Sequence, residues 1–148
     1  LWAAGSLAFE DALRLVRLRG QAMQAASEAI PSGMISLMGA SLEQAQALAR
    51  LGSAKGICSV ANLNAPGQIV VSGELAALDE VEARAPEQGV RRARRLVVAG
   101  GFHSECMRPA SKALAEALGK VTIRAPRVPF VTNVTGDFVS DPAQIRAY

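Results

Sequence analysis

The only histidine of the chain, His103, is the residue best suited to acid–base chemistry. It stands in the sequence Gly100-Gly101-Phe102-His103-Ser104, between an apolar strand-like segment and a predicted helix. An unperturbed imidazole titrates near pH 6.5, so it can accept and release a proton at neutral pH. Loops that follow strands carry many working residues of α/β proteins. A lone histidine can also be an ordinary polar surface residue, and the sequence alone leaves both interpretations open.

Arg19 is a candidate for binding an anion. It lies in the same predicted helix as Arg14 and Arg17 but leaves that helix in a different direction, and Gly20 follows it. A guanidinium group fits a carboxylate or a phosphate in a bidentate pair better than a lysine does. The alternative is a surface arginine whose aliphatic stem packs along the helix.

Other polar patterns have ordinary structural explanations. The stretch Asn62-Leu63-Asn64-Ala65-Pro66-Gly67-Gln68 is typical of a hairpin turn rich in asparagine. The densest basic run is typical of a charged sheet edge and consists of Arg91, Arg92, Arg94 and Arg95. The sequence contains no Gly-x-Ser-x-Gly elbow, no glycine-rich phosphate loop and no cluster with metal-ligand spacing. These residues can therefore orient, clamp and move protons, but none is an evident nucleophile.

Composition narrows the classes of protein that need to be considered. The chain has 148 residues, of which 50% are hydrophobic and 20% charged, and this excludes intrinsic disorder. No apolar run approaches the roughly 18 residues of a membrane helix. The net charge of +3 favours an acidic partner, but 4% aromatic residues give little support to nucleic-acid binding. Cys58 and Cys106 form no CxxC motif and predict two reduced thiols in a cytoplasmic protein.

The middle of the chain predicts a compact α/β unit that could position these residues. Its hydrophobic periodicity changes from helix to strand after residue 33, and Ser41 to Gln44 form a capping box at a helix start. The predicted strands are residues 34–38, 57–62, 68–72 and 94–98, and the predicted helices are residues 42–51, closed by Gly52, and 75–85. This β-α-β-β-α-β order is the ferredoxin-like signature.

The flanking regions predict elements that cannot form a sheet by themselves. They comprise helices at residues 9–26, 106–118 and 142–148 and short strands at residues 121–123 and 130–134. In the first helix, Leu13, Val16 and Met23 share an apolar face, which Leu15 and Leu18 widen. We therefore expect the two ends of the chain to be parts of a larger α/β layer.

Four blocks of sequence together resemble the malonyl-CoA:acyl carrier protein transacylase family. They cover residues 12–24, the hairpin and strand at residues 62–73, the histidine loop at residues 101–110, and residues 131–136. The resemblance implies an α/β fold in which a ferredoxin-like small subdomain, residues 33–99, is inserted in a partial α/β-hydrolase-like large domain, residues 1–32 and 100–148. It places the active site in the cleft between them.

The resemblance also implies a ping-pong acyl transfer in fatty acid biosynthesis. A serine would attack the malonyl thioester of coenzyme A, and the phosphopantetheine thiol of an acidic acyl carrier protein would then accept the malonyl group. His103 matches the catalytic histidine, which a main-chain carbonyl orients in the family. Arg19 matches the arginine that pairs with the malonyl carboxylate, and Phe102 the bulky residue that excludes a methyl branch. Asn64 and Gln68 match positions near the cleft, and no metal or permanently bound cofactor is expected.

The resemblance leaves several questions about the chain open. The family's Gly-His-Ser-Leu-Gly nucleophile elbow should lie just before Leu1 and is not in the chain. We therefore expect these residues to be the middle of a transacylase that would not turn over alone. One alternative is an acyltransferase domain of a modular polyketide or fatty acid synthase, although no linker favours it. Another is a non-catalytic ferredoxin-like module, which does not explain why Arg19, the hairpin and the His103 loop occur together.

Overall fold

The computed structural model describes residues 1–148, and the chain divides into two compact units. The first unit comprises Leu1–Ala22 and Ser111–Tyr148, and the second comprises Met23–Ala110. Both boundaries fall inside helices, α1 (Phe9–Ala29) and α4 (Arg108–Leu118). The domain boundaries near residues 32 and 99 that the resemblance implies stay a prediction. No helix combines the length and the apolar character needed to cross a membrane.

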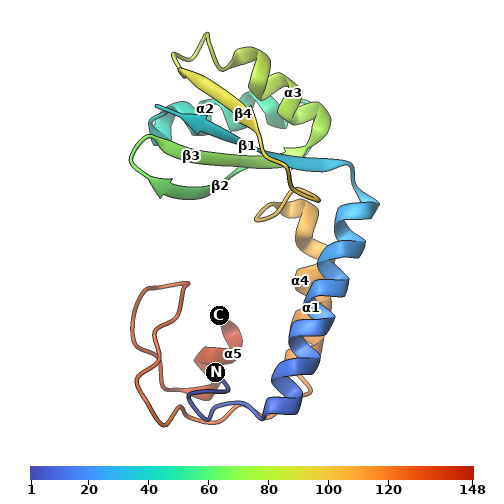
Figure 1. The fold of residues 1–148 in the computed structure, drawn as a ribbon, viewed down its shortest axis with the longest axis vertical. Coiled ribbons are helices and arrows are strands. Elements are labelled where there is room, and N and C mark those ends of the chain that lie inside the picture. Colours follow the sequence, from blue (N-terminus) through green and yellow to red (C-terminus); the bar gives the residue numbers. More distant parts are fainter. The chain divides into compact units, whose positions relative to one another are not determined.

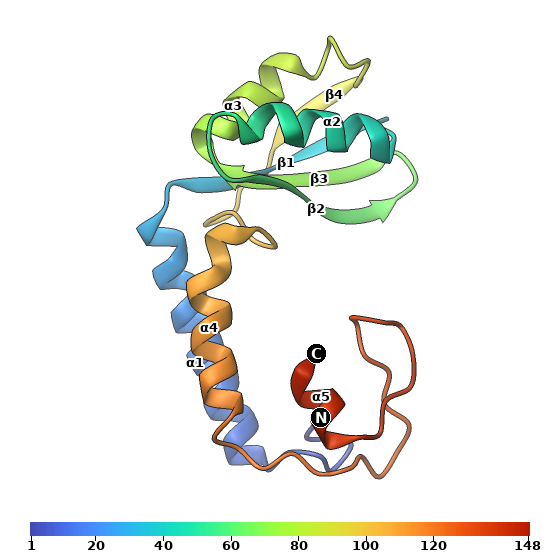
Figure 2. The ribbon, with the colours of Figure 1, turned by 180° about the vertical axis from the view of Figure 1, so that it is seen from behind.

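The second unit is built on a four-stranded antiparallel sheet (Figures 1 and 2). Its strands are β1 (Ser32–Met38), β2 (Cys58–Ala65), β3 (Gln68–Glu74) and β4 (Arg92–Arg95), and they lie in the order β2-β3-β1-β4. Helix α2 (Leu42–Ser53) follows β1, and helix α3 (Leu75–Arg84) follows β3. The two helices contact each other and pack on one face of the sheet. The chain order of these elements is the one that the sequence predicts.

The core of the second unit lies between this sheet face and the two helices. Alternate residues of each central strand point to one face of the sheet, so Ile35 and Leu37 of β1 lie beside Ile69 and Val71 of β3. The helices contribute fully buried side chains to the same cluster, among them Leu48, Leu78 and Val81. Burying one such side chain stabilises the fold by about 1.5–3 kcal/mol.

Helix α2 begins where the sequence predicts but ends later. The Ser41 hydroxyl accepts a hydrogen bond from the Gln44 amide at 3.2 Å, and the Gln44 side chain accepts one from the Ser41 amide at 2.8 Å, which confirms the capping box. The predicted end at Gly52 is wrong, because the helix runs to Ser53. A Cβ built on Gly52 would lie 2.8 Å from the Ala77 carbonyl oxygen and 2.8 Å from the Cys58 sulfur. Gly52 therefore serves close packing rather than termination.

Strand β4 forms an edge of the sheet, as the basic run predicts. Its predicted range of residues 94–98 is wrong, because the strand covers Arg92–Arg95. The last hydrogen bond from this segment to β1 is donated by the Leu96 amide to the Met34 carbonyl. Val97 is fully exposed, so the apolar character of residues 96–98 does not reflect burial in this sheet. Arg95 pairs with Asp79 and Glu82, so its charge is neutralised locally.

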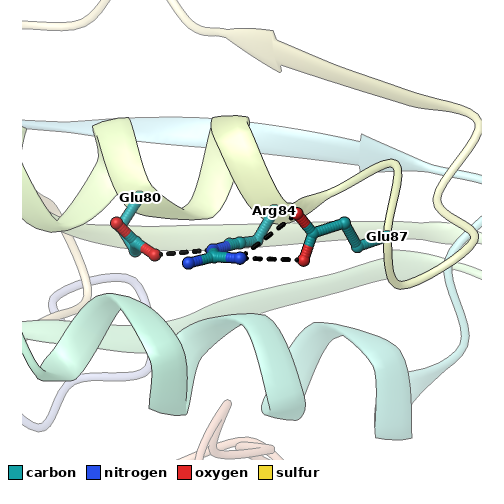
Figure 3. A network of polar contacts seen from close by, with 3 residues as sticks. All are labelled: Glu80, Arg84 and Glu87. Atoms are coloured by element: carbon teal, nitrogen blue, oxygen red, sulfur yellow. Dashed lines mark hydrogen bonds and ion pairs between the residues drawn. The ribbon is translucent and has the colours of Figure 1, made fainter.

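Figure 3 shows a second ion-pair network, which lies along α3 on the side toward α2. The Arg84 guanidinium lies 2.8 Å from a Glu80 oxygen and 3.0 Å from a Glu87 oxygen. The hydrogen bond from Arg84 lowers the pKa of Glu80 below its ordinary value. Exposed pairs of this kind contribute little to stability, so the network orders the surface of α3 without holding the core.

The first unit has a small core and almost no sheet. The buried side chains of its hydrophobic cluster are Leu7, Leu15, Ile123, Val139 and Ile145, and helix α5 (Pro142–Ala147) carries the last of them. The predicted strand at residues 121–123 is absent. The predicted strand at residues 130–134 is reduced to one bridge, between Val131 and Phe138. A strand needs a partner for its backbone hydrogen bonds, and here only Phe130 and Thr132 find one, in Val139 and Asp137.

Helix α1 is longer than predicted and is incompletely covered. It extends to Ala29 rather than residue 26. Leu15 is buried, but Leu13 and Val16 are 59% and 69% exposed, so the apolar face predicted for this helix is only partly packed.

Gly52→Ala is expected to destabilise the second unit by about 1–3 kcal/mol, because the added methyl group has no space between α2 and α3. Gly20→Ala is the matched control. Gly20 also lies inside a helix, but a Cβ there meets nothing within 4 Å, so this change should stabilise by up to about 1 kcal/mol. Urea unfolding of both variants measures the difference, and equal stabilities would contradict the packing argument.

Candidate functional site

The backbone of His103 adopts an unusual conformation. Its φ of 59° makes it the one non-glycine residue with a positive φ in the chain. This left-handed region is sterically unfavourable for residues with a Cβ, so surrounding contacts must maintain it. His103 lies in the loop between β4 and a short 3-10 helix, η1 (Glu105–Met107). The side chain is exposed, and that of Phe102 is half-buried.

Hydrogen bonds hold the loop on both sides of His103. The Gly101 amide donates to the Ser32 hydroxyl at 2.9 Å. The Ser104 hydroxyl donates to the Gly101 carbonyl at 2.5 Å and accepts from the Cys106 amide at 3.3 Å, which caps η1. The loop is therefore fixed to the start of β1 and to its own following helix.

The two glycines before Phe102 allow the loop to lie against other elements. A Cβ on Gly100 would lie 2.5 Å from the Ser27 hydroxyl oxygen, in the last turns of α1. A Cβ on Gly101 would lie 3.1 Å from the Ser32 Cβ and 3.3 Å from the Cys106 sulfur. Both glycines are buried. The two glycines thus allow the backbone of the loop to pack closely against neighbouring residues, while the His103 side chain stays exposed.

The imidazole of His103 makes no hydrogen bond or ion pair with another residue of the chain. The carbonyl that the resemblance implies as its orienting partner therefore stays a prediction. An exposed imidazole on a fixed loop can exchange protons with a group that comes within hydrogen-bond reach of it.

Arg19 lies in the first unit and is exposed. Unlike Arg14, which pairs with Asp11 at 3.1 Å, it forms no ion pair within the chain. It lines a hollow of about 400 Å³ whose other walls are apolar and consist of Leu1, Trp2, Leu7, Ala12, Leu15, Val16, Leu114 and Leu118. A guanidinium beside an apolar wall attracts a carboxylate more strongly than one surrounded by water.

Asn64 and Gln68 lie at the hairpin between β2 and β3, as the sequence predicts. Register shifts occur between Val60 and Asn62 and between Leu63 and Ala65, so Asn64 is the extra residue of a β-bulge. Gln68 pairs with Met38 at the end of β1, whereas the His103 loop is bonded to Ser32 at its start. Six strand residues span about 20 Å, so the structure does not bring the hairpin beside His103.

The two cysteines lack the features of an activated nucleophile. Burial raises the pKa of the Cys58 thiol to about 11, with a smaller contribution from the nearby Cys106. Cys106 is fully buried in η1, and both thiols are free. A reactive cysteine needs a lowered pKa and access to solvent. No three His, Cys, Asp or Glu side chains gather in a way that could hold a metal ion.

Comparison with known proteins identifies the family. The sequence profile described as "Acyl transferase domain" matches residues 1–148. The chain belongs to the acyl transferase domain family. It is 39% identical over 150 residues to the malonyl CoA-acyl carrier protein transacylase of Bacillus subtilis, covering 99% of the chain and 46% of that protein.

Solved structures give the same assignment. The malonyl-CoA:acyl carrier protein transacylase of Xanthomonas oryzae pv. oryzae superposes with a TM-score of 0.88 at 39% identity, covering 98% of this chain and 46% of that one. A malonyl-transacylase solved in complex with a type II PKS acyl-carrier protein superposes with a TM-score of 0.86 at 32% identity, covering 97% and 47%. The chain thus spans about half the length of the relatives it matches, and the resemblance seen in the sequence is confirmed.

In this acyl transferase segment the predicted site residues fall on both units. Arg19 belongs to the first, and the second holds Phe102 and His103 in one loop and Asn64 and Gln68 at the hairpin. Sequence reasoning missed the contacts of Ser32 and Ser104 with this loop. The serine before a helix is a capping signal that could have indicated Ser104. The contact of Ser32 joins residues 69 positions apart and has no local signal.

Cys58 is expected to resist alkylation. With its pKa near 11, the thiolate fraction at pH 8 is about a hundredfold lower than for a thiol with the ordinary pKa of 9.0. Below pH 9 the thiol is neutral in both the folded and the unfolded chain, and as the pH rises from 9 to 11 the free energy of unfolding falls because the unfolded chain ionises first. Mass spectrometry after iodoacetamide treatment at pH 8 measures the rate at Cys58. Alkylation as fast as for free cysteine would contradict the burial argument.

Proposed function

We propose that the full-length protein, the polypeptide to which these 148 residues belong, transfers a malonyl group from malonyl-CoA to the phosphopantetheine thiol of an acyl carrier protein in fatty acid biosynthesis. The observation that carries the proposal is the match of the entire chain to the acyl transferase domain, with a malonyl transacylase 39% identical. The reaction proceeds through an acyl-serine intermediate. The nucleophilic serine lies outside the described residues, and no permanently bound cofactor takes part.

The finer architecture is part of the same proposal. The sheet order β2-β3-β1-β4, with both helices on one face, supports a ferredoxin-like subdomain. The first unit, with its short core and exposed apolar side chains, supports membership of an α/β-hydrolase-like large domain. The proposed limits are residues 33–99 for the small subdomain, with residues 1–32 and 100–148 in the large domain.

His103 acts as the general base and acid of the proposed reaction. It takes the proton from the serine hydroxyl as that oxygen attacks the thioester carbonyl, and it returns the proton to the coenzyme A thiolate that leaves. In the second half-reaction it takes the proton of the carrier thiol and restores it to the serine. Its exposed imidazole and fixed loop support this role.

Arg19 and Phe102 set the acyl specificity in the proposal. Arg19 pairs with the malonyl carboxylate, supported by its unpaired guanidinium beside an apolar hollow. An acetyl group has no carboxylate and leaves that cation without a partner, so malonyl is favoured. The bulk of Phe102 excludes a methyl branch. Asn64 and Gln68 are proposed to support the hairpin near the cleft.

The proposed protein partner is an acidic acyl carrier protein. The net charge of +3 favours it, and a structural relative was solved in complex with such a carrier. That carrier belongs to a type II PKS, so polyketide synthesis is the second candidate setting for the same transfer. The proposed location is the cytoplasm, and the two free thiols are consistent with a reducing compartment.

Arg19→Ala in the full-length protein is expected to lower kcat/KM for malonyl-CoA by roughly 10- to 100-fold, the effect of losing a charge-assisted pair. The rate with acetyl-CoA should be unchanged or higher, so selectivity falls. Arg17→Ala is the matched control, because Arg17 is an exposed arginine of the same helix that does not line the hollow. Equal losses in the two variants would contradict a carboxylate-binding role.

His103→Ala is expected to lower kcat for malonyl transfer by about 10²- to 10⁴-fold, the usual contribution of a positioned acid–base group. Transfer of malonyl from malonyl-CoA to holo acyl carrier protein, followed by mass spectrometry of the carrier, measures it. Unchanged turnover in this variant would overturn the proposed mechanism.

A further inference from the structure

We propose that Ser32 is a positioning residue that fixes the His103 loop to the central strand of the sheet. The inference rests on the proposed function, in which His103 must meet the reacting groups in one orientation. The Ser32 hydroxyl is hydrogen-bonded to neither His103 nor Phe102 and would act through the backbone of Gly101.

The Ser32 hydroxyl makes two hydrogen bonds that join distant parts of the chain. It donates to the Ile30 carbonyl at 2.9 Å and accepts from the Gly101 amide at 2.9 Å. Ser32 is the first residue of β1 and pairs with Glu74 of β3. Since β1 pairs with β3 along its whole length, beginning at Ser32, and with β4 from Ile35 onward, Ser32 is a fixed point of attachment for the loop.

Gly101 is held by hydrogen bonds at both its amide and its carbonyl. Its amide is held by Ser32, and its carbonyl accepts from the Ser104 hydroxyl at 2.5 Å. These contacts lie on both sides of Phe102 and His103. The left-handed backbone of His103 needs such support. The hydrogen bond of Ser104 is local, so it closes the turn but does not fix the turn relative to the sheet. The hydrogen bond of Ser32 fixes the position of the turn relative to the sheet.

Removing the Ser32 hydroxyl leaves the buried Gly101 amide without its partner. A buried, unsatisfied amide is unfavourable, so the loop is expected to shift or open toward water. A displacement of the imidazole by about 1 Å can lower catalysis by two orders of magnitude while substrate binding is retained. Ser32→Ala should therefore affect kcat much more than KM.

The test uses the full-length protein with three variants. Ser32→Ala removes the hydroxyl, and Ser32→Thr keeps it. Ser53→Ala is the matched control, because the Ser53 hydroxyl also contacts two backbone groups, the carbonyls of Ala49 and Cys58, but is not bonded to the loop. Hydrogen exchange of residues 99–106 reports on the anchoring, and malonyl transfer gives kcat and KM.

Ser32→Ala is expected to accelerate exchange in this loop about fivefold or more, the effect of losing one hydrogen bond. It should also lower kcat by roughly 10- to 100-fold, with KM changed less than about twofold. Ser32→Thr should restore both, and Ser53→Ala should change neither. If Ser32→Ala does not fold, Ser32→Cys, a weaker acceptor of similar size, provides the same comparison.

Unchanged loop exchange in Ser32→Ala, or equal effects of Ser32→Ala and Ser53→Ala on kcat, would overturn the inference. Faster exchange with unchanged kcat would also overturn it, while loss of activity in His103→Ala would keep the proposed function intact. Full activity of His103→Ala would instead refute the proposed function, and the exchange data would still decide whether Ser32 anchors the loop.

Discussion

Strand β1 is hydrogen-bonded on both sides, and the second unit is organised around it. It pairs with β3 along its whole length and with β4 from Ile35 to Met38. Helix α2, which follows β1, packs on the sheet that contains β1. The loop that carries His103 is hydrogen-bonded to Ser32, the first residue of β1. A change in the position of β1 would therefore move the core and the candidate catalytic loop together.

Small side chains make this arrangement possible at several close approaches. Gly52 lets α2 reach α3, and Gly73 lets β3 lie against the backbone of Ile57 and Cys58. Gly100 lets the loop approach α1 at Ser27. Each of these contacts involves backbone atoms or the first atoms of a side chain, so rotation of a side chain could not relieve an added methyl group.

The sequence predicts the second unit well because its signals are local. The capping box at Ser41, the Pro-Gly turn at the hairpin and the short apolar strands depend on neighbouring residues, and the strands form where periodicity indicates. Strand ends are predicted less accurately, as β4 shows: Leu96 and Val97 are apolar and yet lie beyond the end of the strand. Hydrophobicity signals burial without saying in which layer the residue will be buried.

The first unit is predicted less well, for a different reason. Residues 121–123 and 130–134 have strand-like sequences, but a strand exists only when another strand satisfies its backbone. The exposed Leu13 and Val16 show the same limit for a helix, because an amphipathic pattern does not indicate which surface covers its apolar face.

The candidate site shows the same difference between local and long-range signals. The residue types of Arg19 and His103 indicate their chemistry from the sequence. The left-handed backbone of His103 and its attachment to Ser32 depend on contacts between distant residues and emerge only from the fold. Sequence thus indicates which groups can react, and long-range packing determines how firmly they are held.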